Sequence, residues 1–165
     1  MLADYLPGCA DAFDRAARES ALQTQRLHIA GVVVQLRCAG AAVAEATLPA
    51  LAHLAVDWRT WRPADAASEL TLNLWDGAAP GIKPPPPPFT LEDYRRYGQR
   101  AVAHDGIRSL MVAPTAGQLF AFDRANHQGY FWVEDANQLT IYERAAPVQT
   151  LFHWALAEAG WQIGR

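Results

Sequence analysis

The sequence lacks the features on which several common enzyme classes depend. Lys83 is the only lysine among 14 basic residues, and it precedes a run of prolines instead of following a glycine-rich loop. A phosphate-binding P-loop needs exposed backbone N–H groups and a lysine that meets the phosphates, so the position of Lys83 excludes one. The chain also has no GxGxxG, GxSxG or HExxH motif. The sequence therefore predicts no catalytic residues, no metal site and no cofactor.

Long apolar runs, clustered cysteines and a large net charge are missing as well. No stretch of about 18 apolar residues occurs, and no basic region precedes an apolar segment at the N-terminus, so we expect neither a membrane span nor a secretory signal. Cys9 and Cys38 lie outside any CxxC pattern, which predicts two reduced, buried or half-buried thiols in a cytoplasmic protein. The net charge of −3 gives no electrostatic reason to bind nucleic acid.

What the chain does contain is enough apolar material for one domain, residues 1–165, because 51% of its residues are hydrophobic. The first part, residues 1–76, predicts a helix, a hairpin, a second helix and a strand, over 8–24, Leu27–Leu36, Ala41–Leu54 and Leu70–Trp75. The hairpin is indicated by two apolar runs around a short glycine-containing link. The strand is indicated by three leucines that alternate with polar residues and so share one face.

Residues 77–90 form a proline-rich linker that contains five consecutive prolines, Pro84 to Pro88. Such a run favours polyproline II and cannot enter a sheet. We expect a stiff spacer that crosses the surface without regular hydrogen bonding, while a ligand for an SH3-like partner is the alternative. Shortening the run by two residues is then expected to cost under about 1 kcal/mol, if loop-closure entropy is the only contribution.

Residues 107–143 predict antiparallel strands, because apolar stretches recur about every ten residues between turn-rich segments. The four expected strands are Ser109–Val112, Leu119–Asp123, Gly129–Val133 and Gln138–Glu143. A C-terminal helix is expected over 147–160, where Pro147 opens it and Gly160 ends it. Together these elements predict an α+β fold with a largely antiparallel, mixed sheet and two or three helices packed on it.

Nucleophilic catalysis would require a serine or cysteine next to a base, and the sequence does not show which residues are neighbours in space. The few serines, including Ser109, lie in no recognised catalytic context. His104-Asp105-Gly106 is interpreted as a polar loop rather than as an acid–base pair. The aromatic residues of 130–132, and Tyr142 on the next expected strand, are interpreted as core packing rather than as a base-stacking surface, because acidic rather than basic residues surround them.

One stretch, residues 130–154, carries a recognisable pattern. Its elements are Tyr130–Val133, Asp135-Ala136, Tyr142–Pro147 and Leu151–Trp154, with Gly160 beyond them. Stretches of similar texture come earlier, at Leu27–Leu36, Glu45–Leu54 and Leu74–Asp76, and the proline-rich linker follows them. The pattern resembles the N-terminal domain of bacterial serine kinase-like proteins, which are related to HPr kinase/phosphorylase and, more distantly, to ATP-dependent phosphoenolpyruvate carboxykinase.

The resemblance implies a non-catalytic N-terminal accessory domain that supports a kinase catalytic domain or recruits its substrate. The family's P-loop, catalytic acid and metal-binding groups would come after Arg165, so no residue of this chain takes those roles. Members of the group often accompany peptide-modification genes, which implies a peptide substrate. The alternatives are a stand-alone protein-interaction or scaffold module, either monomeric or dimeric, and a small enzyme with an unrecognised site.

The helix expected over 147–160 is apolar on nearly every side, so the sheet cannot cover it completely. The side expected on the sheet consists of Leu151, Ala155 and Ala159. Exposed apolar surface marks interaction sites, and we expect the uncovered side to bind a kinase domain, another protein or a second copy of the chain. The candidate interface consists of Tyr142, Glu143, Arg144, Trp154 and Trp161.

Overall fold

The computed structural model describes residues 1–29, 31–57, 68–78, 81–96, 100–144 and 146–156. In this part of the chain the strands are β1 (Leu22–Ile29), β2 (Val32–Ala39), β3 (Ser68–Asp76), β4 (Ala101–His104), β5 (Arg108–Ala113), β6 (Gln118–Asp123) and β7 (Gln128–Val133). The helices are α1 (Leu2–Glu19), α2 (Ala41–Leu51), α3 (Leu91–Arg96) and α4 (Ala146–Leu156), with 3-10 turns η1 (Ala52–Leu54), η3 (Pro114–Ala116) and η4 (Ala136–Gln138). The expected α+β class with a mixed sheet is confirmed.

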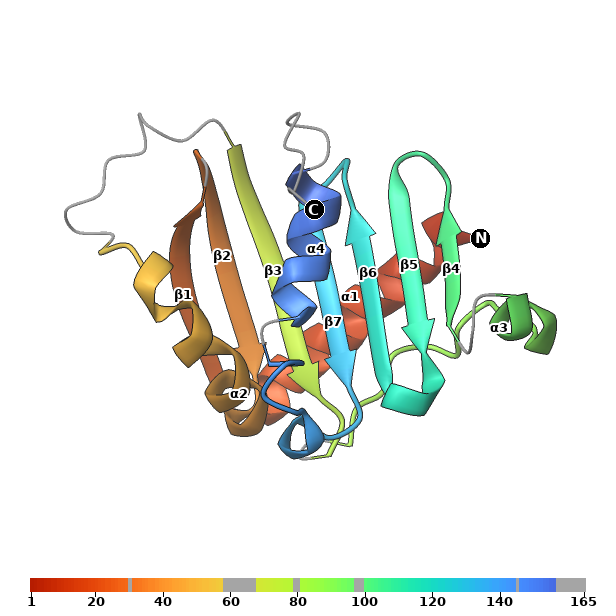
Figure 1. Cartoon of the computed structure of the whole chain (residues 1–165), viewed down its shortest axis with the longest axis horizontal. Helices are drawn as coiled ribbons and strands as arrows, with labels where there is room; N and C mark the ends of the chain where they lie inside the picture. Colours follow the sequence, from red (N-terminus) through yellow and green to blue (C-terminus); the bar gives the residue numbers. More distant parts are fainter. Residues whose placement is uncertain (30, 58–67, 79–80, 97–99, 145, 157–165) are drawn as a thin grey trace.

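All seven of these strands belong to one sheet, in the order β1-β2-β3-β7-β6-β5-β4 (Figure 1). Both neighbours of β3, which are β2 and β7, run parallel to it, and the other neighbouring pairs are antiparallel. The parallel pair of β2 and β3 is joined through α2, because parallel strands need a crossover connection. β3 therefore joins an antiparallel hairpin on one side to an antiparallel meander on the other.

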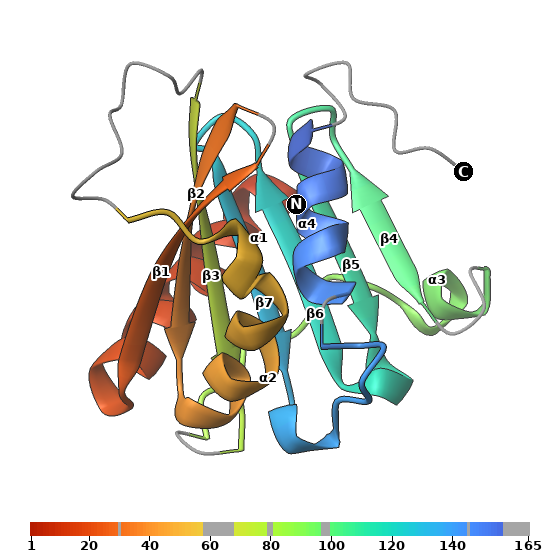
Figure 2. The ribbon, with the colours of Figure 1, turned by 60° about the vertical axis from the view of Figure 1, so that its left-hand side comes forward.

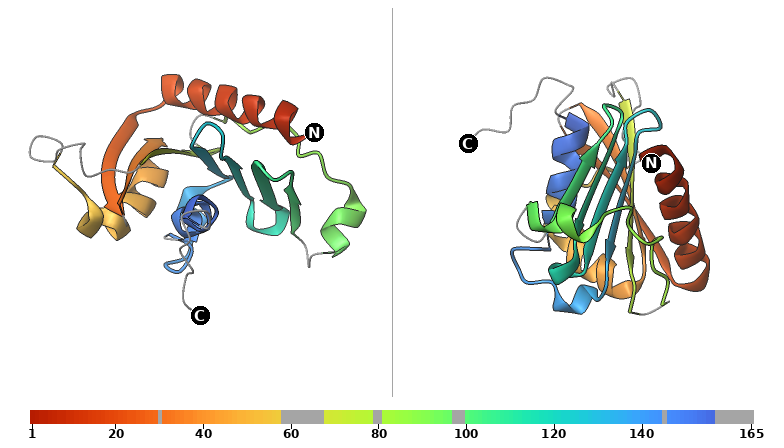
Figure 3. Two further views of the ribbon diagram at one scale, coloured as in Figure 1. Left: turned by 90° about the horizontal axis from the view of Figure 1, so that it is seen from above. Right: turned by 90° about the vertical axis from the view of Figure 1, so that its right-hand side faces the viewer.

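Helices cover both faces of the sheet. Figure 3 shows α1 on one face and α2 and α4 on the opposite face, and Figure 2 shows α2 and α4 next to each other. Because side chains alternate along a strand, each central strand contributes to two cores. In β3, the leucines at 70, 72 and 74 pack beneath α2 and α4, whereas Trp75 packs beneath α1. The alternation of leucines predicted the first core correctly but did not reveal the second.

The buried carboxylate of Asp76 holds the end of β3 in place. Its side chain is 1% exposed. It accepts the backbone N–H of Ala78 at 2.5 Å, just after the strand, and that of Ala136 at 2.6 Å, in η4. Asp76 also lies opposite Val133, the last residue of β7. The carboxylate thus fixes the two central strands and the turn that follows them as one unit.

The proline-rich segment packs against α1, which corrects the expectation of a free spacer. The hydroxyl of Tyr5 donates to the carbonyl of Pro85 at 2.8 Å, and the indole N–H of Trp75 donates to the carbonyl of Ile82 at 3.1 Å. Ile82 is buried in the core beneath α1. A Cβ on Gly8 would lie 2.4 Å from the ring of Pro85. The expected lack of regular structure is nevertheless observed over residues 81–88.

The strand expected over Gln138–Glu143 is wrong, because this stretch contains the end of η4 and a turn. β7 already has β3 on one side and β6 on the other, so the segment that follows β7 cannot pair with it as a hairpin strand. β4 and α3 were not predicted from the sequence. The first helix begins at Leu2 and ends at Glu19, so residues 22–24 belong to β1 and not to the helix. The C-terminal helix is confirmed to Leu156, and residues 157–160 lie outside the described residues.

We predict that Asp76→Ala lowers the free energy of unfolding by about 3 kcal/mol or more, because the buried N–H of Ala136 and the part-buried N–H of Ala78 lose a charged acceptor. Urea denaturation of the purified protein measures the loss. Asp105→Ala is the matched control, since Asp105 also accepts two backbone N–H groups, those of Ile107 and Arg108, in an exposed loop. Water replaces that carboxylate, so the control is expected to lose only about 1 kcal/mol. Equal losses in the two variants would contradict the role given to Asp76.

We also predict that Gly8→Ala destabilises the protein by about 1–3 kcal/mol, because the methyl group overlaps the Pro85 ring. In the Pro85→Ala background the clash is removed, and the same change should stabilise α1 by up to about 1 kcal/mol through helix propensity. Thermal and urea unfolding of the four proteins in this cycle give the coupling. If Gly8→Ala has the same effect in both backgrounds, the prolines do not constrain α1.

Candidate functional site

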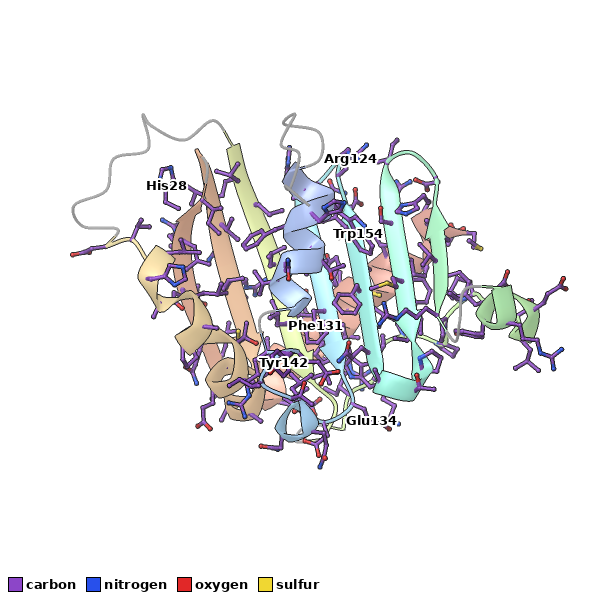
Figure 4. All side chains as sticks on the ribbon, in the orientation of Figure 1. His28, Arg124, Phe131, Glu134, Tyr142 and Trp154 are labelled. Carbon is purple, nitrogen blue, oxygen red and sulfur yellow. The ribbon has the colours of Figure 1, made fainter. Side chains whose placement is uncertain are left out.

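The predicted interface residues do not form one surface. Tyr142, Glu143 and Arg144 lie together in the turn between η4 and α4, whereas Trp154 lies near the far end of α4 (Figure 4). Trp161 lies outside the described residues. The face of α4 expected on the sheet agrees with the structure where it is described, since Leu151 is fully buried and Ala155 packs against the same core. That Tyr142 and Trp154 contact a partner stays a prediction.

The turn before α4 presents two exposed apolar side chains, Ile141 at 75% and Tyr142 at 89% exposure, so the interpretation of Tyr142 as a core residue is wrong. Glu143 holds this turn closed, because its carboxylate accepts the backbone N–H of Thr140 at 2.9 Å. The same N–H lowers the pKa of Glu143. The exposed pair is therefore held on a fixed turn, near the end of the sheet that is drawn at the bottom of Figure 4, where Tyr142 is labelled.

The structure brings together a serine and a histidine that the sequence could not. On neighbouring strands, His104 Nδ1 lies 2.7 Å from Ser109 Oγ, and the ring of Trp154 meets that of His104 edge-on at 6.0 Å. An activated nucleophile also needs a group that orients the base. The adjacent carboxylate of Asp105 instead accepts N–H groups of its own loop and of Arg108. We therefore interpret Ser109 and His104 as a cross-strand pair that stabilises the sheet edge.

The more unusual arrangement lies on the face of the sheet that α1 covers. Strand register places six polar side chains side by side at the same level of six neighbouring strands, all on this face. We call them the polar row, and they are Arg26, Gln35, Thr71, Gln128, Asp123 and Arg108. Polar side chains on a face that also carries an apolar core are exceptions that need an explanation. The row could not be predicted from the sequence, because its members are scattered from Arg26 to Gln128 and meet only through the register.

One end of the polar row forms a groove with the first half of α1, the α1 groove. Its volume is about 320 Å³. One wall is apolar and comes from the helix, and the other is polar and comes from the strands and the turn between β6 and β7. The lining residues are Ala3, Leu6, Pro7 and Ala10 on the helix, and Arg108, Asp123, Asn126, Gln128 and Tyr130 opposite. A concave site with an apolar wall and a few convergent polar groups is the usual form of a ligand site.

Hydrogen bonds within the polar wall decide what it can offer. The hydroxyl of Tyr130 donates to the amide oxygen of Gln128, so the NH₂ group of Gln128 is left as a donor. The NH₂ group of Asn126 donates to Asp123 at 2.9 Å, so the amide oxygen of Asn126 is left as an acceptor. The groove thus presents one amide donor and one amide acceptor beside the apolar helix.

Charge in the α1 groove is largely compensated. The carboxylate of Asp123, which is 8% exposed, lies 3.8 Å from Nε of Arg108, and the same arginine contacts Asp105 at 3.3 Å. Burial raises the pKa of Tyr130 to about 12, with smaller contributions from Cys9, Asp14 and Asp123. Tyr130 is therefore a neutral hydroxyl at pH 7 and keeps its role as donor to Gln128. The arrangement suits binding of a neutral polar group.

The two thiols agree with the sequence-based expectation. Cys9 and Cys38 are free and fully buried, on opposite faces of the sheet. Burial raises the pKa of each to about 12. A thiol with so high a pKa is a poor nucleophile at neutral pH, so neither cysteine adds chemistry to the α1 groove.

The raised pKa of Tyr130 leads to a prediction about alkaline stability. The pKa is 10.0 for an ordinary tyrosine and about 12 here, so the unfolded state releases the proton first. The stability that this difference in pKa contributes is fully present below pH 10, the pKa of Tyr130 in the unfolded chain, and is lost as the pH rises toward 12. We expect Tyr130→Phe to lose less stability than the wild-type protein between pH 9 and 11.5, as measured by urea denaturation at each pH. Parallel pH profiles for the two proteins would show that Tyr130 ionises normally.

Other classes of site were sought in the same residues. The described part of the chain has no cluster of three histidine, cysteine or carboxylate side chains able to hold a metal ion. Among the described helices, none is both long and apolar enough to cross a membrane. Comparison of the chain with models of protein families, with curated proteins and with solved structures finds no match. Functional inference for this chain therefore rests on the geometry of the α1 groove.

Proposed function

We propose that this chain is a non-catalytic accessory domain that recruits a peptide through the α1 groove. The resemblance to the N-terminal domain of serine kinase-like proteins supports the accessory role, in which the recruited peptide is presented to a kinase catalytic domain. The observation that carries the proposal is the pairing of an amide donor on Gln128 with an amide acceptor on Asn126 beside an apolar wall.

A peptide group suits this wall because it carries one N–H donor and one C=O acceptor. The carbonyl of a bound peptide would accept from Gln128, and its N–H would donate to Asn126. The alanines and Pro7 of α1 would contact its side chains. The volume of about 320 Å³ accommodates roughly one or two residues, at the lower end of the range for ligand pockets.

The absence of catalysis in this proposal follows from what surrounds the groove. Asp123 and Arg108 partly neutralise each other, and Tyr130 stays protonated at neutral pH. A general base must reach the ligand with a free acceptor atom, whereas the carboxylate of Asp123 faces Arg108 and accepts from Asn126, and the hydroxyl of Tyr130 donates to Gln128. The role left to these side chains is to bind and orient a ligand.

Ile141 and Tyr142 favour a second contact, with a partner protein. Large exposed apolar side chains on a fixed turn are typical anchors of protein interfaces, and tyrosine is among the residues that contribute most there. This turn lies at the opposite end of the strands from the polar row, because it follows the end of β7 at Val133 whereas the row contains Gln128 at its start. A domain that recruits a peptide at one end and contacts its catalytic partner at the other fits both features.

We predict that a capped dipeptide, acetyl-Ser-Ala-amide, shifts the amide NMR signals of groove residues when titrated into the ¹⁵N-labelled protein. Ala10→Phe fills the α1 groove and should abolish these shifts. Ala17→Phe is the matched control, since Ala17 is also half-buried on α1 but does not line the groove, and it should leave them unchanged. Magnesium-ATP should produce no shifts in any of the proteins.

Two outcomes would contradict the proposal. Dipeptide shifts that persist in folded Ala10→Phe protein would place binding elsewhere. Tight binding of ATP would indicate a nucleotide site, contrary to the argument from Lys83.

A further inference from the structure

The polar row continues well beyond the α1 groove. From Gln128 in β7 it passes to Thr71 in β3, Gln35 in β2 and Arg26 in β1, each directly opposite the next. None of the last three residues lines the groove. Thr71 and Gln35 are half-buried, and Arg26 is exposed. A ligand bound in the groove would therefore meet polar side chains if it extended across the strands.

α1 diverges from the row along its length, and Thr71 and Gln35 stay partly exposed. Phe13, in the second half of α1, packs edge-on against Trp75 with ring centres 6.1 Å apart. Trp75 is four residues along β3 from Thr71, which places it about 13 Å from the row. Figure 1 shows the same divergence, with α1 running behind the sheet at an angle to the strands. Figure 4 labels His28 and Arg124, which mark the end of the sheet at which the row lies.

The charges of the row are confined to its two ends and are compensated there. At one end Arg108 faces Asp123, and at the other Arg26 lies 3.7 Å from Glu69. The three members between them, Gln128, Thr71 and Gln35, are uncharged and carry hydrogen-bond donors and acceptors. This pattern offers nothing for a phosphate or an acidic ligand, which would need uncompensated positive charge. It matches a neutral chain with a regular series of polar groups.

The length of the row sets the length of the ligand. Neighbouring strands lie about 4.8 Å apart, so six strands span about 24 Å. An extended peptide advances about 3.3 Å per residue and would need about seven residues to cover that distance. The main chain supplies a polar group at every residue, so an uncharged peptide can bond to amides and hydroxyls spaced by the strands.

We propose that the recruited ligand is an uncharged, extended peptide of about seven residues that leaves the α1 groove and crosses β7, β3, β2 and β1 along the polar row. This inference rests on the proposed function, because it takes the groove as the anchoring end. Gln35 and Thr71 contact only the part of the peptide outside the groove, and they set the preference for length.

The experiment compares two capped peptides by isothermal titration calorimetry, one of three residues, acetyl-Ser-Ala-Ser-amide, and one of seven residues with the same alternation. We expect the longer peptide to bind at least tenfold tighter, with little change when salt is raised, since no net charge is paired. Thr71→Val removes a hydroxyl with little change in side-chain shape, and Gln35→Ala removes an amide. Each single variant should bind the longer peptide about fivefold more weakly, as expected for the loss of one hydrogen bond. Neither change should affect the shorter peptide.

Gln128→Ala should weaken both peptides, because Gln128 belongs to the groove and to the row. Gln23→Ala is the control, since Gln23 is an exposed residue of β1 outside the row, and it should weaken neither. Equal affinity for the two peptides, or a longer peptide unaffected by Thr71→Val and Gln35→Ala, would overturn the extended path and leave the groove as the binding site. Binding of neither peptide would overturn the peptide ligand itself, and with it the proposed function.

Discussion

The parallel pairing of β3 with β7 is the constraint on which the rest of the structure depends. This pairing joins the hairpin of β1 and β2, from the first part of the chain, to the meander of β4 to β7, from the later part. Six cross-strand pairs, from Thr71 with Gln128 to Asp76 with Val133, define it. Both strands are central, so both of their faces must be covered. The leucines of β3 and Phe131 of β7 satisfy one face beneath α2 and α4. On the other face the apolar residues of β3, β5, β6 and β7 give way to polar ones toward the end of the strands at which the polar row lies.

Much of the fold was accessible from the sequence because its signals are local. Alternation of apolar residues found β2, β3, β5, β6 and β7 at least in part, because successive side chains of a strand point to opposite faces of the sheet and give the pattern a period of two. The errors have a common cause in long-range pairing. The stretch Gln138–Glu143 has strand-like composition, yet no edge is available next to β7. Residues 22–24 pair with β2 at Arg37–Ala39, and this tertiary pairing outweighs their helical propensity.

The candidate site was far less accessible. Gln35, Thr71 and Gln128 each look like an ordinary outward-facing residue of an alternating strand. Only the register, in which Thr71 lies opposite both Gln35 and Gln128, places them on one line. The groove depends in addition on the direction of α1, and no local pattern in residues 2–19 fixes the angle at which a helix crosses a sheet. The proline segment posed the same problem, because contacts such as Gly8 with Pro85 are invisible in composition.

An ordinary solvated face would explain the polar row without any ligand, and the burial of its surroundings speaks against that explanation. A solvated face carries exposed charges, whereas Asp123 is 8% exposed, Tyr130 is 4% exposed and Asn73 is 2% exposed, all on this face. Each of these groups has lost water and is held by a specific partner, such as Arg37 for Asn73 at 3.0 Å. Apolar residues there would avoid the cost of desolvating polar groups. Residues that break the local rules of packing without a gain in stability are expected at functional sites, and two of these three, Asp123 and Tyr130, line the α1 groove.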